Sequence, residues 1–357
     1  MTLPERPLRH CPRLVGLALL LAFALAGIWN AGALQSRDTA HGADIAQRLD
    51  RGDRVDMDMY RALEARVAKG ENYYAAVAEE HRRFGFPTSP AVAVRTPVLA
   101  WTSAVWGAQG WRVIAVVLWA ANILAWWSVF AGRASVAERG ATATLAALFG
   151  AIAFIPDVAY SHEALAGLML SLALAVKDRS WPAALALAAS AVALRELALP
   201  FLLLWLALAG SGRRRREALA VGAAIALLLA GFALHAQAVE AMRLPGDAVS
   251  PGWAGLIGPS LPLYGIHVTT LLQTLPLWIA GPLGVLPLLG WLALGGRTGT
   301  FALGWFAGFM LFAALFARQE NFYWMALFVP AYGIGLAFVP RAIADVFRFR
   351  RPATASA

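Results

Sequence analysis

The chain has 357 residues, of which 60% are hydrophobic and 14% are charged, whereas a soluble domain carries about 25% charged residues. The net charge of +9 comes from arginines that gather at the ends of apolar segments, a pattern typical of membrane proteins and not of nucleic-acid binding. Cys11 is the single cysteine, which excludes an intrachain disulfide, and the sequence has no phosphate-binding glycine loop, dinucleotide fingerprint or zinc-protease motif.

The first expected element is a transmembrane helix over residues 14–34, and the whole chain, 1–357, is expected to form a single membrane domain. Arginines precede this apolar run, so its start should lie on the cytoplasmic side. The small residues 31–33 resemble a signal-peptide cleavage site, but the run is longer than the apolar part of a usual signal peptide. We therefore expect an uncleaved first helix, with cleavage as the alternative.

Residues 35–96 form the one long polar segment between apolar runs, and they should emerge as an outer loop. The spacing of apolar side chains predicts two amphipathic helices in this loop, one ending at Gly70 and one at Gly85. Prolines mark the exit, and a short apolar helix over 97–108 should follow, too short to span the membrane alone.

The remaining transmembrane helices should lie within residues 97–340, followed by a basic cytoplasmic tail over 341–357. Loops expected inside carry arginine, and loops expected outside carry acids or mixed charge. The sequence therefore predicts an all-α, polytopic membrane helix bundle of about ten helices, with both termini in the cytoplasm.

The apolar block 181–210 is the most informative segment for topology. As one span it would place the four arginines of 213–216 outside, against the bias of the other loops. As a hairpin broken at Arg195 and Glu196 it keeps both basic ends inside, and each arm is then about 21 Å long, shorter than the hydrocarbon core. The two charges should therefore face a water-filled outer cavity, because facing lipid would cost at least about 2.5–3.5 kcal/mol.

Two carboxylates in the outer loop, Asp56 and Asp58, are candidate general bases because they precede Tyr60 in a polar segment beside the membrane. A carboxylate can take the proton of a hydroxyl within hydrogen-bond distance, and a partly dry site raises its pKa toward a useful range. The alternative is that both aspartates only solvate or cap a surface helix.

Three arginines expected on the outer side, Arg95, Arg195 and Arg318, are candidates to hold a lipid phosphate, because a guanidinium presents forked donors. The alternatives are a buried pair with Glu196 or with another helix for Arg195, and a loop or snorkelling position for Arg318. Glu163, at the outer end of a helix, would either accept a sugar hydroxyl or cap that helix.

The outer loop carries an ordered set of motifs, namely Asp56-x-x-x-Tyr60, then Gly70-x-x-Tyr73-Tyr74, then Pro97 before a short helix. In this arrangement the chain resembles the GT-C superfamily of integral-membrane glycosyltransferases, in particular its bacterial branch that uses polyprenol-phosphate sugars. Weaker matches are Glu163, the break at 195–196 and the polar motif 318–324. Members often have Pro-Pro or His-Pro-Pro where Arg95-Thr96-Pro97 stands here.

The resemblance implies inverting transfer of a sugar from a polyprenol-phosphate-linked donor to a hydroxyl of a glycan, lipid or protein acceptor, on the periplasmic side of the bacterial inner membrane. In that family an aspartate of the first outer loop is the general base, which maps to Asp56, with Asp58 as the rival. Some members use a divalent metal, but no obligatory cofactor or metal ligand is expected here. The residues expected to contact substrate are Tyr60, Glu71, Tyr74, Arg95, Glu163, Arg195, Glu196, Arg318 and Asn321.

Two other functions stay open from the sequence. The chain could be a transporter or flippase of a lipid-linked glycan, although it has no second half that matches the first. It could also be a non-catalytic subunit of a membrane assembly, in which case the acids of the first loop would pack against a partner.

Overall fold

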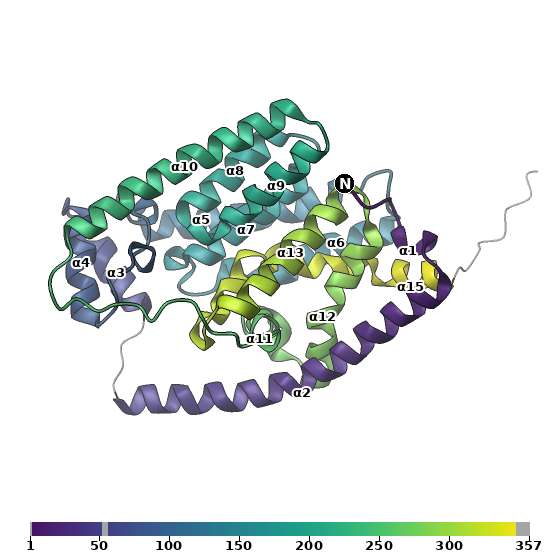
Figure 1. Ribbon diagram of the computed structural model, residues 1–357, viewed down its shortest axis with the longest axis horizontal. Helices are drawn as coiled ribbons and strands as arrows, with labels where there is room; N and C mark the ends of the chain where they lie inside the picture. Colours follow the sequence, from purple (N-terminus) through teal and green to yellow (C-terminus); the bar gives the residue numbers. More distant parts are fainter. Residues whose placement is uncertain (1, 52–55, 348–357) are drawn as a thin grey trace, which may run out of the picture.

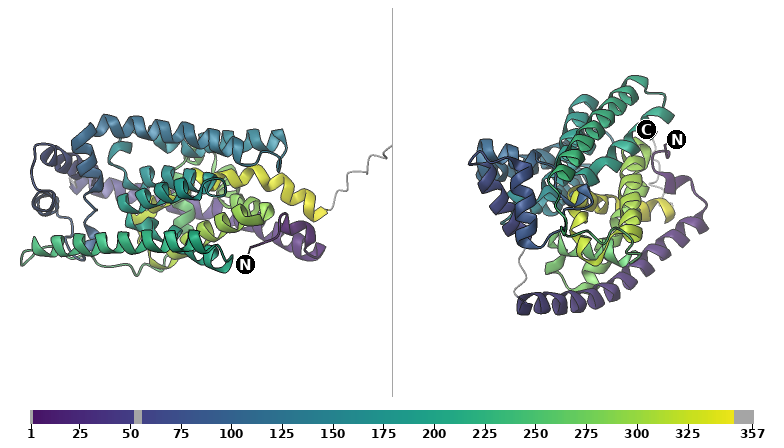
Figure 2. Two further views of the ribbon diagram at one scale, coloured as in Figure 1. Left: turned by 90° about the horizontal axis from the view of Figure 1, so that it is seen from above. Right: turned by 60° about the vertical axis from the view of Figure 1, so that its left-hand side comes forward.

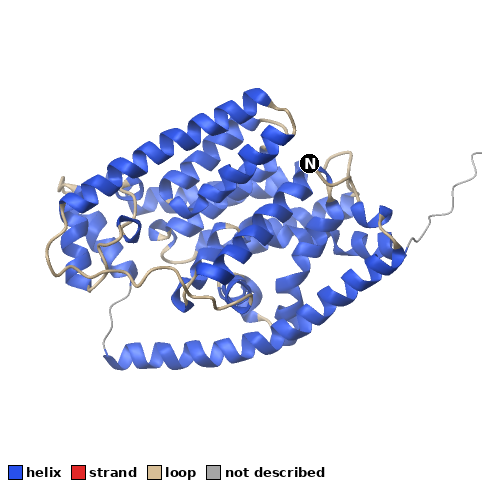
Figure 3. Cartoon of the chain, in the orientation of Figure 1, coloured by secondary structure: helices blue, strands red, loops and turns tan. Residues whose placement is uncertain are grey.

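The computed structural model describes residues 2–51 and 56–347, with side chains for residues 2–40 and 57–347. This described part is built from helices and has no strand beyond two isolated bridges (Figure 3). The α-helices are α1 (Pro7–His10), α2 (Arg13–Arg51), α3 (Asp56–Val67), α4 (Tyr73–Phe84), α5 (Val98–Val129), α6 (Val136–Phe149), α7 (His162–Val176), α8 (Trp181–Leu194), α9 (Leu199–Ser211), α10 (Arg215–Ala241), α11 (Ser260–Val268), α12 (Leu277–Leu294), α13 (Gly296–Phe316), α14 (Val329–Tyr332) and α15 (Val339–Phe347). The 3-10 helices are η1 (Ala91–Ala93), η2 (Gly150–Phe154), η3 (Val158–Tyr160), η4 (Glu196–Ala198), η5 (Leu271–Thr274), η6 (Gln319–Leu327) and η7 (Gly333–Phe338).

The chain is a multi-pass membrane protein, because six segments of its described part are long and apolar enough to cross a bilayer. Three shorter apolar helices accompany them, and the expected total of about ten membrane helices stays a prediction. The six long segments are Arg13–Ala40, Ala91–Val129, Arg215–Ala241, Leu277–Leu294, Gly296–Phe316 and Val329–Phe347, and the three shorter ones are His162–Val176, Trp181–Leu194 and Glu196–Ser211.

The bundle has two distinct ends. The polar helices α3 and α4 gather at one end, and α1 and α15 lie at the other (Figure 1, Figure 2). At the α1 and α15 end, Arg6 Nε donates to Asp345 at 3.1 Å and Arg341 Nε donates to Glu138 at 2.8 Å. The expected cytoplasmic tail therefore begins as a docked helix, because ion pairs at Arg341 and Asp345 hold α15 against the bundle.

Helix α2 is longer than the expected span of residues 14–34 and continues to Arg51. The sequence after residue 34 has no proline and no glycine until Gly42, so nothing ends the helix at the predicted boundary. Its first half packs closely on α12 through small residues. A Cβ on Gly281 would lie 2.6 Å from the backbone nitrogen of Ala31, so only glycine permits this approach.

The polar end has the two helices that the sequence predicts. Helix α4 begins after Asn72, whose side chain accepts from the backbone of Tyr74, and it ends at Gly85 with φ of 73°. The predicted short helix is also present, because Gly107 has φ of 70° and ψ of 172° and divides α5 into a short first piece and a long span.

Helices α8 and α9 form the predicted hairpin. Arg195, between them, has extended backbone and contacts Glu163 at the start of α7, whereas Trp205 of α9 lies under Lys177 at the end of α7. Helix α9 therefore returns toward the end from which α8 starts. Phe201 and Trp205 of this hairpin pack against Phe301 of α13. The same core contains the fully buried side chains of Trp126, Trp291 and Phe306.

Candidate functional site

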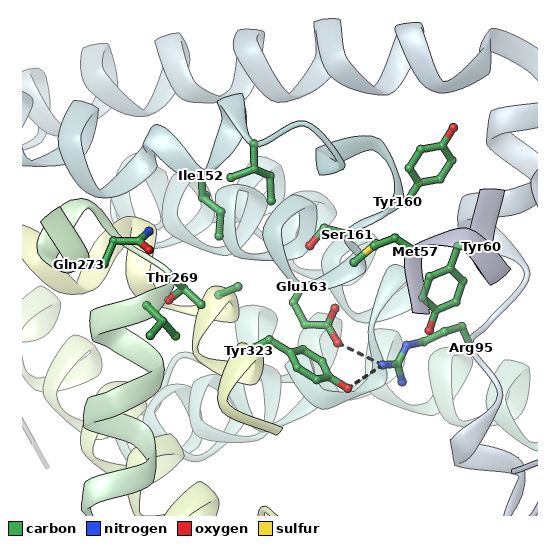
Figure 4. A pocket seen from close by; sticks show the side chains of 13 residues that line it. Met57, Tyr60, Arg95, Ile152, Tyr160, Ser161, Glu163, Thr269, Gln273 and Tyr323 are labelled. Carbon is green, nitrogen blue, oxygen red and sulfur yellow. Dashed lines mark hydrogen bonds and ion pairs between the residues drawn. The ribbon is translucent and has the colours of Figure 1, made fainter. Parts of the chain in front are cut away.

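A cavity of about 260 Å³ lies where the polar end of the bundle meets the apolar helices (Figure 4). Its walls come from α3, from the chain just before α5, from the segment that runs from η2 to the first turn of α7, from the end of α11 and η5, and from η6. The lining residues are Met57, Tyr60, Arg95, Ile152, Ile155, Tyr160, Ser161, Glu163, Val268, Thr269, Gln273, Tyr323 and Ala326.

Arg95 is the cation of this cavity, and hydrogen bonds at Arg95 and at the next residue hold the chain there. The Tyr73 hydroxyl donates to the Arg95 carbonyl at 2.6 Å, and the Thr96 hydroxyl donates to the carbonyl of Ala193 at 2.6 Å. The guanidinium contacts Glu163 and Tyr323, each at 3.4 Å (Figure 4). These are long bonds, and Arg95 Nε is buried without an acceptor among the described residues. The guanidinium therefore has unused donor capacity.

Glu163 is held more tightly by a second arginine. Arg195 Nε donates to Glu163 at 2.6 Å, and Arg195 also pairs with Glu196 on its other side. Glu163 lies in the first turn of α7, where the helix dipole favours an acid, and Ser161 caps that helix by accepting from the backbone of Ala164. Glu163 thus both contacts the arginines and occupies the favourable end of a helix.

Helix α3 supplies one wall through Met57 and Tyr60. The ring of Tyr60 lies 5.2 Å from the ring of His162 at the start of α7. Asp58 does not line the cavity, since its side chain is 51% exposed and binds Arg61 at 2.6 Å. Asp56 is the first residue of α3, but its side chain lies outside the part that the structure describes.

Several residues predicted to bind substrate lie away from the cavity. Glu71 is bound by Arg66, which lowers the pKa of the Glu71 carboxyl, and Tyr74 is 3.4 Å from His235. Arg318 pairs with Glu320 at 3.1 Å, and its backbone nitrogen donates to the side chain of Asn321 at 3.0 Å. These four predicted residues, Glu71, Tyr74, Arg318 and Asn321, are not brought to the site. Tyr60, Arg95 and Glu163 are, with Arg195 and Glu196 directly behind them.

The cavity also contains residues that sequence reasoning missed. Tyr323 lies five positions after Arg318, inside the polar motif 318–324 that the sequence does mark. Ser161 stands two positions before Glu163, so it could have been found from that acid. Thr269 and Gln273 follow α11 in a segment without a sequence signal for a site.

No group of three or more His, Cys, Asp or Glu side chains in the described part of the chain lies close enough to hold a metal ion. Among the lining residues Glu163 is the single acid, and it faces two arginines. The cavity therefore contains a buried arginine with unused hydrogen-bond donors and a glutamate whose charge is balanced by two arginines. It also contains several hydroxyl or amide groups. These are the groups that would bind an anion next to a polyhydroxylated ligand.

Comparisons with known proteins give no relative for this chain. No protein-family model, no curated protein and no solved structure matches it.

Proposed function

We propose that this chain is an inverting glycosyltransferase of the GT-C type in the bacterial inner membrane, which moves a sugar from a polyprenol-phosphate carrier to an acceptor hydroxyl on the periplasmic side. The observation that carries the proposal is Arg95. Its side chain is 13% exposed, lines the cavity, and has two hydrogen bonds that are each 3.4 Å long. A buried guanidinium with unused donors is well suited to a phosphate group.

The charges around Glu163 support this role for Arg95. Arg195 Nε is 2.6 Å from Glu163 Oε1, whereas Arg95 Nη2 is 3.4 Å from the same oxygen. A phosphate oxygen that bound Arg95 would replace the weaker of these two contacts. Glu163 would keep its stronger partner, so phosphate binding would not leave a buried carboxylate unpaired.

The other polar groups of the cavity suit a sugar. Tyr323 and Ser161 carry hydroxyls, Gln273 carries an amide, and all three lie within the same walls as Arg95 (Figure 4). Each can exchange hydrogen bonds with sugar hydroxyls. Glu163 can accept a bond from such a hydroxyl while the arginines hold it in place.

We assign the general base to Asp56 and not to Asp58. Asp58 already binds Arg61 and is half exposed, whereas Asp56 directly precedes Met57, which lines the cavity. In the proposed step, the Asp56 carboxylate takes the proton of the acceptor hydroxyl, and the hydroxyl oxygen bonds to the anomeric carbon of the sugar. The bond from that carbon to the phosphate oxygen breaks, and its electron pair leaves with the polyprenyl phosphate, whose charge Arg95 stabilises.

The test uses the purified chain in lipid nanodiscs with a panel of synthetic polyprenyl-phosphate hexoses and pentoses and extracted cell-envelope acceptors. Released polyprenyl phosphate and the glycosylated product are measured by mass spectrometry. We expect Asp56→Asn to lower kcat by about 10²- to 10⁴-fold, the range of general-base catalysis. Arg95→Met should abolish transfer. Arg243→Ala changes an exposed arginine that pairs with Glu240 and does not line the cavity, so it should leave transfer unchanged.

Three outcomes would remove the proposal or part of it. Full activity of Arg95→Met would remove the phosphate site. If Asp58→Asn lowers kcat by the factor expected for Asp56→Asn, and Asp56→Asn itself leaves kcat unchanged, the general base is Asp58. Movement of a fluorescent lipid-linked glycan across vesicles, without release of polyprenyl phosphate from any donor, would identify a flippase instead.

A further inference from the structure

We propose that the acceptor enters the cavity between α3 and the segment Asp157–Ser161, and that Arg61 is the positioning residue that holds this entrance closed. That an acceptor is what enters rests on the proposed function. The opening itself is a property of the residues at the rim and can be measured without any assay of transfer.

The two sides of the proposed entrance face each other across the cavity rim. Met57 and Tyr60 come from α3, and Tyr160 and Ser161 come from the chain that leads into α7. Figure 4 shows Tyr60 and Tyr160 at the same end of the cavity, away from Gln273. A contact between the two sides at this end would therefore control how open the cavity is.

Arg61 connects these two sides. Its guanidinium binds Asp157 and lies 5.6 Å from the centre of the Tyr160 ring, a cation–π distance. It also binds Asp58 on its own helix at 2.6 Å. One arginine of α3 therefore contacts both the acid and the aromatic ring of the opposite side.

The connection is weak enough to open. The side chains of Arg61 and Asp157 are 43% and 33% exposed, and an ion pair in such a setting contributes little and is screened by salt. If the ion pair between Arg61 and Asp157 breaks, Arg61 keeps its ion pair with Asp58, so opening does not leave the arginine unpaired. This gives Asp58 a structural role as the partner that Arg61 keeps when the entrance opens.

The second half of α3 is buried against its neighbours. Leu63 and Val67 are buried in a cluster with α4 and the start of α5. Arg66 binds Glu80 at 2.9 Å as well as Glu71. The end of α3 is thus tied to α4, whereas its start is tied to the opposite side through Arg61 and the contact between Tyr60 and His162.

The experiment measures access to the cavity with a single thiol. In a Cys11→Ser background, Ser161→Cys places one reactive sulfur in the cavity wall, and its rate of labelling by a membrane-impermeant maleimide reports opening. We expect Arg61→Ala to raise this rate by up to about fivefold, the upper end of the range for loss of one exposed ion pair. Raising the salt concentration should speed labelling of the parent and have little further effect on Arg61→Ala.

Matched variants separate this proposal from a general loosening of the fold. Arg243→Ala removes another partly exposed arginine, which has an ion pair to Glu240, and should not change the rate. The exchange Arg61→Asp with Asp157→Arg should restore slow labelling. A second reporter, Ala326→Cys, lies in another wall of the same cavity and replaces Ser161→Cys if the latter weakens the cap of α7.

Unchanged labelling in both Arg61→Ala and high salt would overturn the proposal. A clear response without transfer of any sugar would uphold the entrance and remove the proposed function. Where transfer is measurable, Arg61→Ala should change the KM for the acceptor and leave the KM for the lipid donor unchanged. A change in the donor KM alone would assign this opening to the donor and contradict the proposal.

Discussion

Arg195 Nε lies 2.6 Å from Glu163 Oε1, although the two residues are 32 positions apart and neither side chain is more than 7% exposed. The contact joins the break between α8 and α9 to the first turn of α7. It also determines which charge the cavity presents, because it neutralises Glu163 and leaves Arg95 with long bonds. The hairpin and the proposed phosphate site therefore depend on the same ion pair.

The first prediction concerns the stability that this pair provides. Arg195→Met should lower the free energy of unfolding by about 3–5 kcal/mol, because it leaves the buried carboxylate of Glu163 without its closest cation. Arg95→Met should cost much less, since its bonds to Glu163 and Tyr323 are 3.4 Å long. Thermal unfolding of the detergent-solubilised proteins compares the two.

The double variant Arg195→Met with Glu163→Gln provides the control for that prediction. Removing the carboxylate charge should recover part of the lost stability, because the glutamine leaves no buried anion behind. If the double variant is as unstable as the sum of the single changes, Arg195 acts through packing and not through its charge.

The second prediction concerns Glu64, a buried residue on α3. Burial raises the pKa of Glu64 to about 7, while the nearby Ser103 hydroxyl has a smaller lowering effect. The folded chain therefore binds more protons than the unfolded chain between pH 4.5, the ordinary value, and about 7. The free energy of unfolding should fall as pH rises through this window, by up to roughly 3 kcal/mol. Glu64→Gln should be more stable than the parent at pH 8 and lose that advantage at pH 4.5.

Asp247 provides a comparison of opposite sign. Arg82 Nε lies 2.7 Å from its carboxylate and holds the pKa of Asp247 well below its usual range. Its stabilising effect should be present above the ordinary pKa of an aspartate and be lost as pH falls. Asp247→Asn should therefore be less stable than the parent at pH 7, with a difference that narrows in acid. Chemical denaturation at a series of pH values tests both variants together.

The third prediction concerns the approach of α7 to η6, which carries Tyr323 and Ala326 into the cavity. A Cβ on Gly167 would lie 2.0 Å from the carbonyl oxygen of Ala326, so Gly167→Ala must push the two segments apart. We expect a loss of about 1–3 kcal/mol of stability. Gly308→Ala, where a Cβ meets no atom within 4 Å, should be neutral or slightly stabilising. Thermal unfolding of both variants checks the contrast, and equal effects would contradict it.

Local signals in the sequence were sufficient for the helices of the polar end and for the hairpin. Gly85 ends α4 because its φ of 73° suits glycine, and the arginines of 213–216 predicted the return at Arg195. Both the glycine and the arginine cluster can be recognised from the order of residues along the chain, without knowledge of tertiary contacts. The continuation of α2 to Arg51 was missed because the pattern of apolar residues ends before the helix does.

Only part of the candidate site could be predicted from the sequence. Arg95 and Glu163 stand out as charges at the ends of apolar runs, so composition alone marks them. Tertiary packing decides which charged side chains pair with each other. In the folded chain Glu71 pairs with Arg66, and Asp58 pairs with Arg61. Tyr323 reaches the cavity because η6 is a 3-10 helix, whose side chains follow a period that a search for α-helical faces does not test.

The last prediction tests on which side of the membrane each end of the hairpin lies. If α8 starts from the cytoplasmic side and α9 returns to it, Ser211 and Asp157 must face opposite compartments, because Asp157 lies at the α3 end of the bundle, bound to Arg61. In a Cys11→Ser background, an impermeant maleimide added to intact spheroplasts should label Asp157→Cys and spare Ser211→Cys until the membrane is opened. Ser211→Cys keeps all four arginines of 213–216, so the charge bias that directs topology is preserved. Labelling of Ser211→Cys from outside would mean that residues 181–210 cross the membrane once, and it would place Arg195 in mid-membrane without the outer cavity that the proposed function requires.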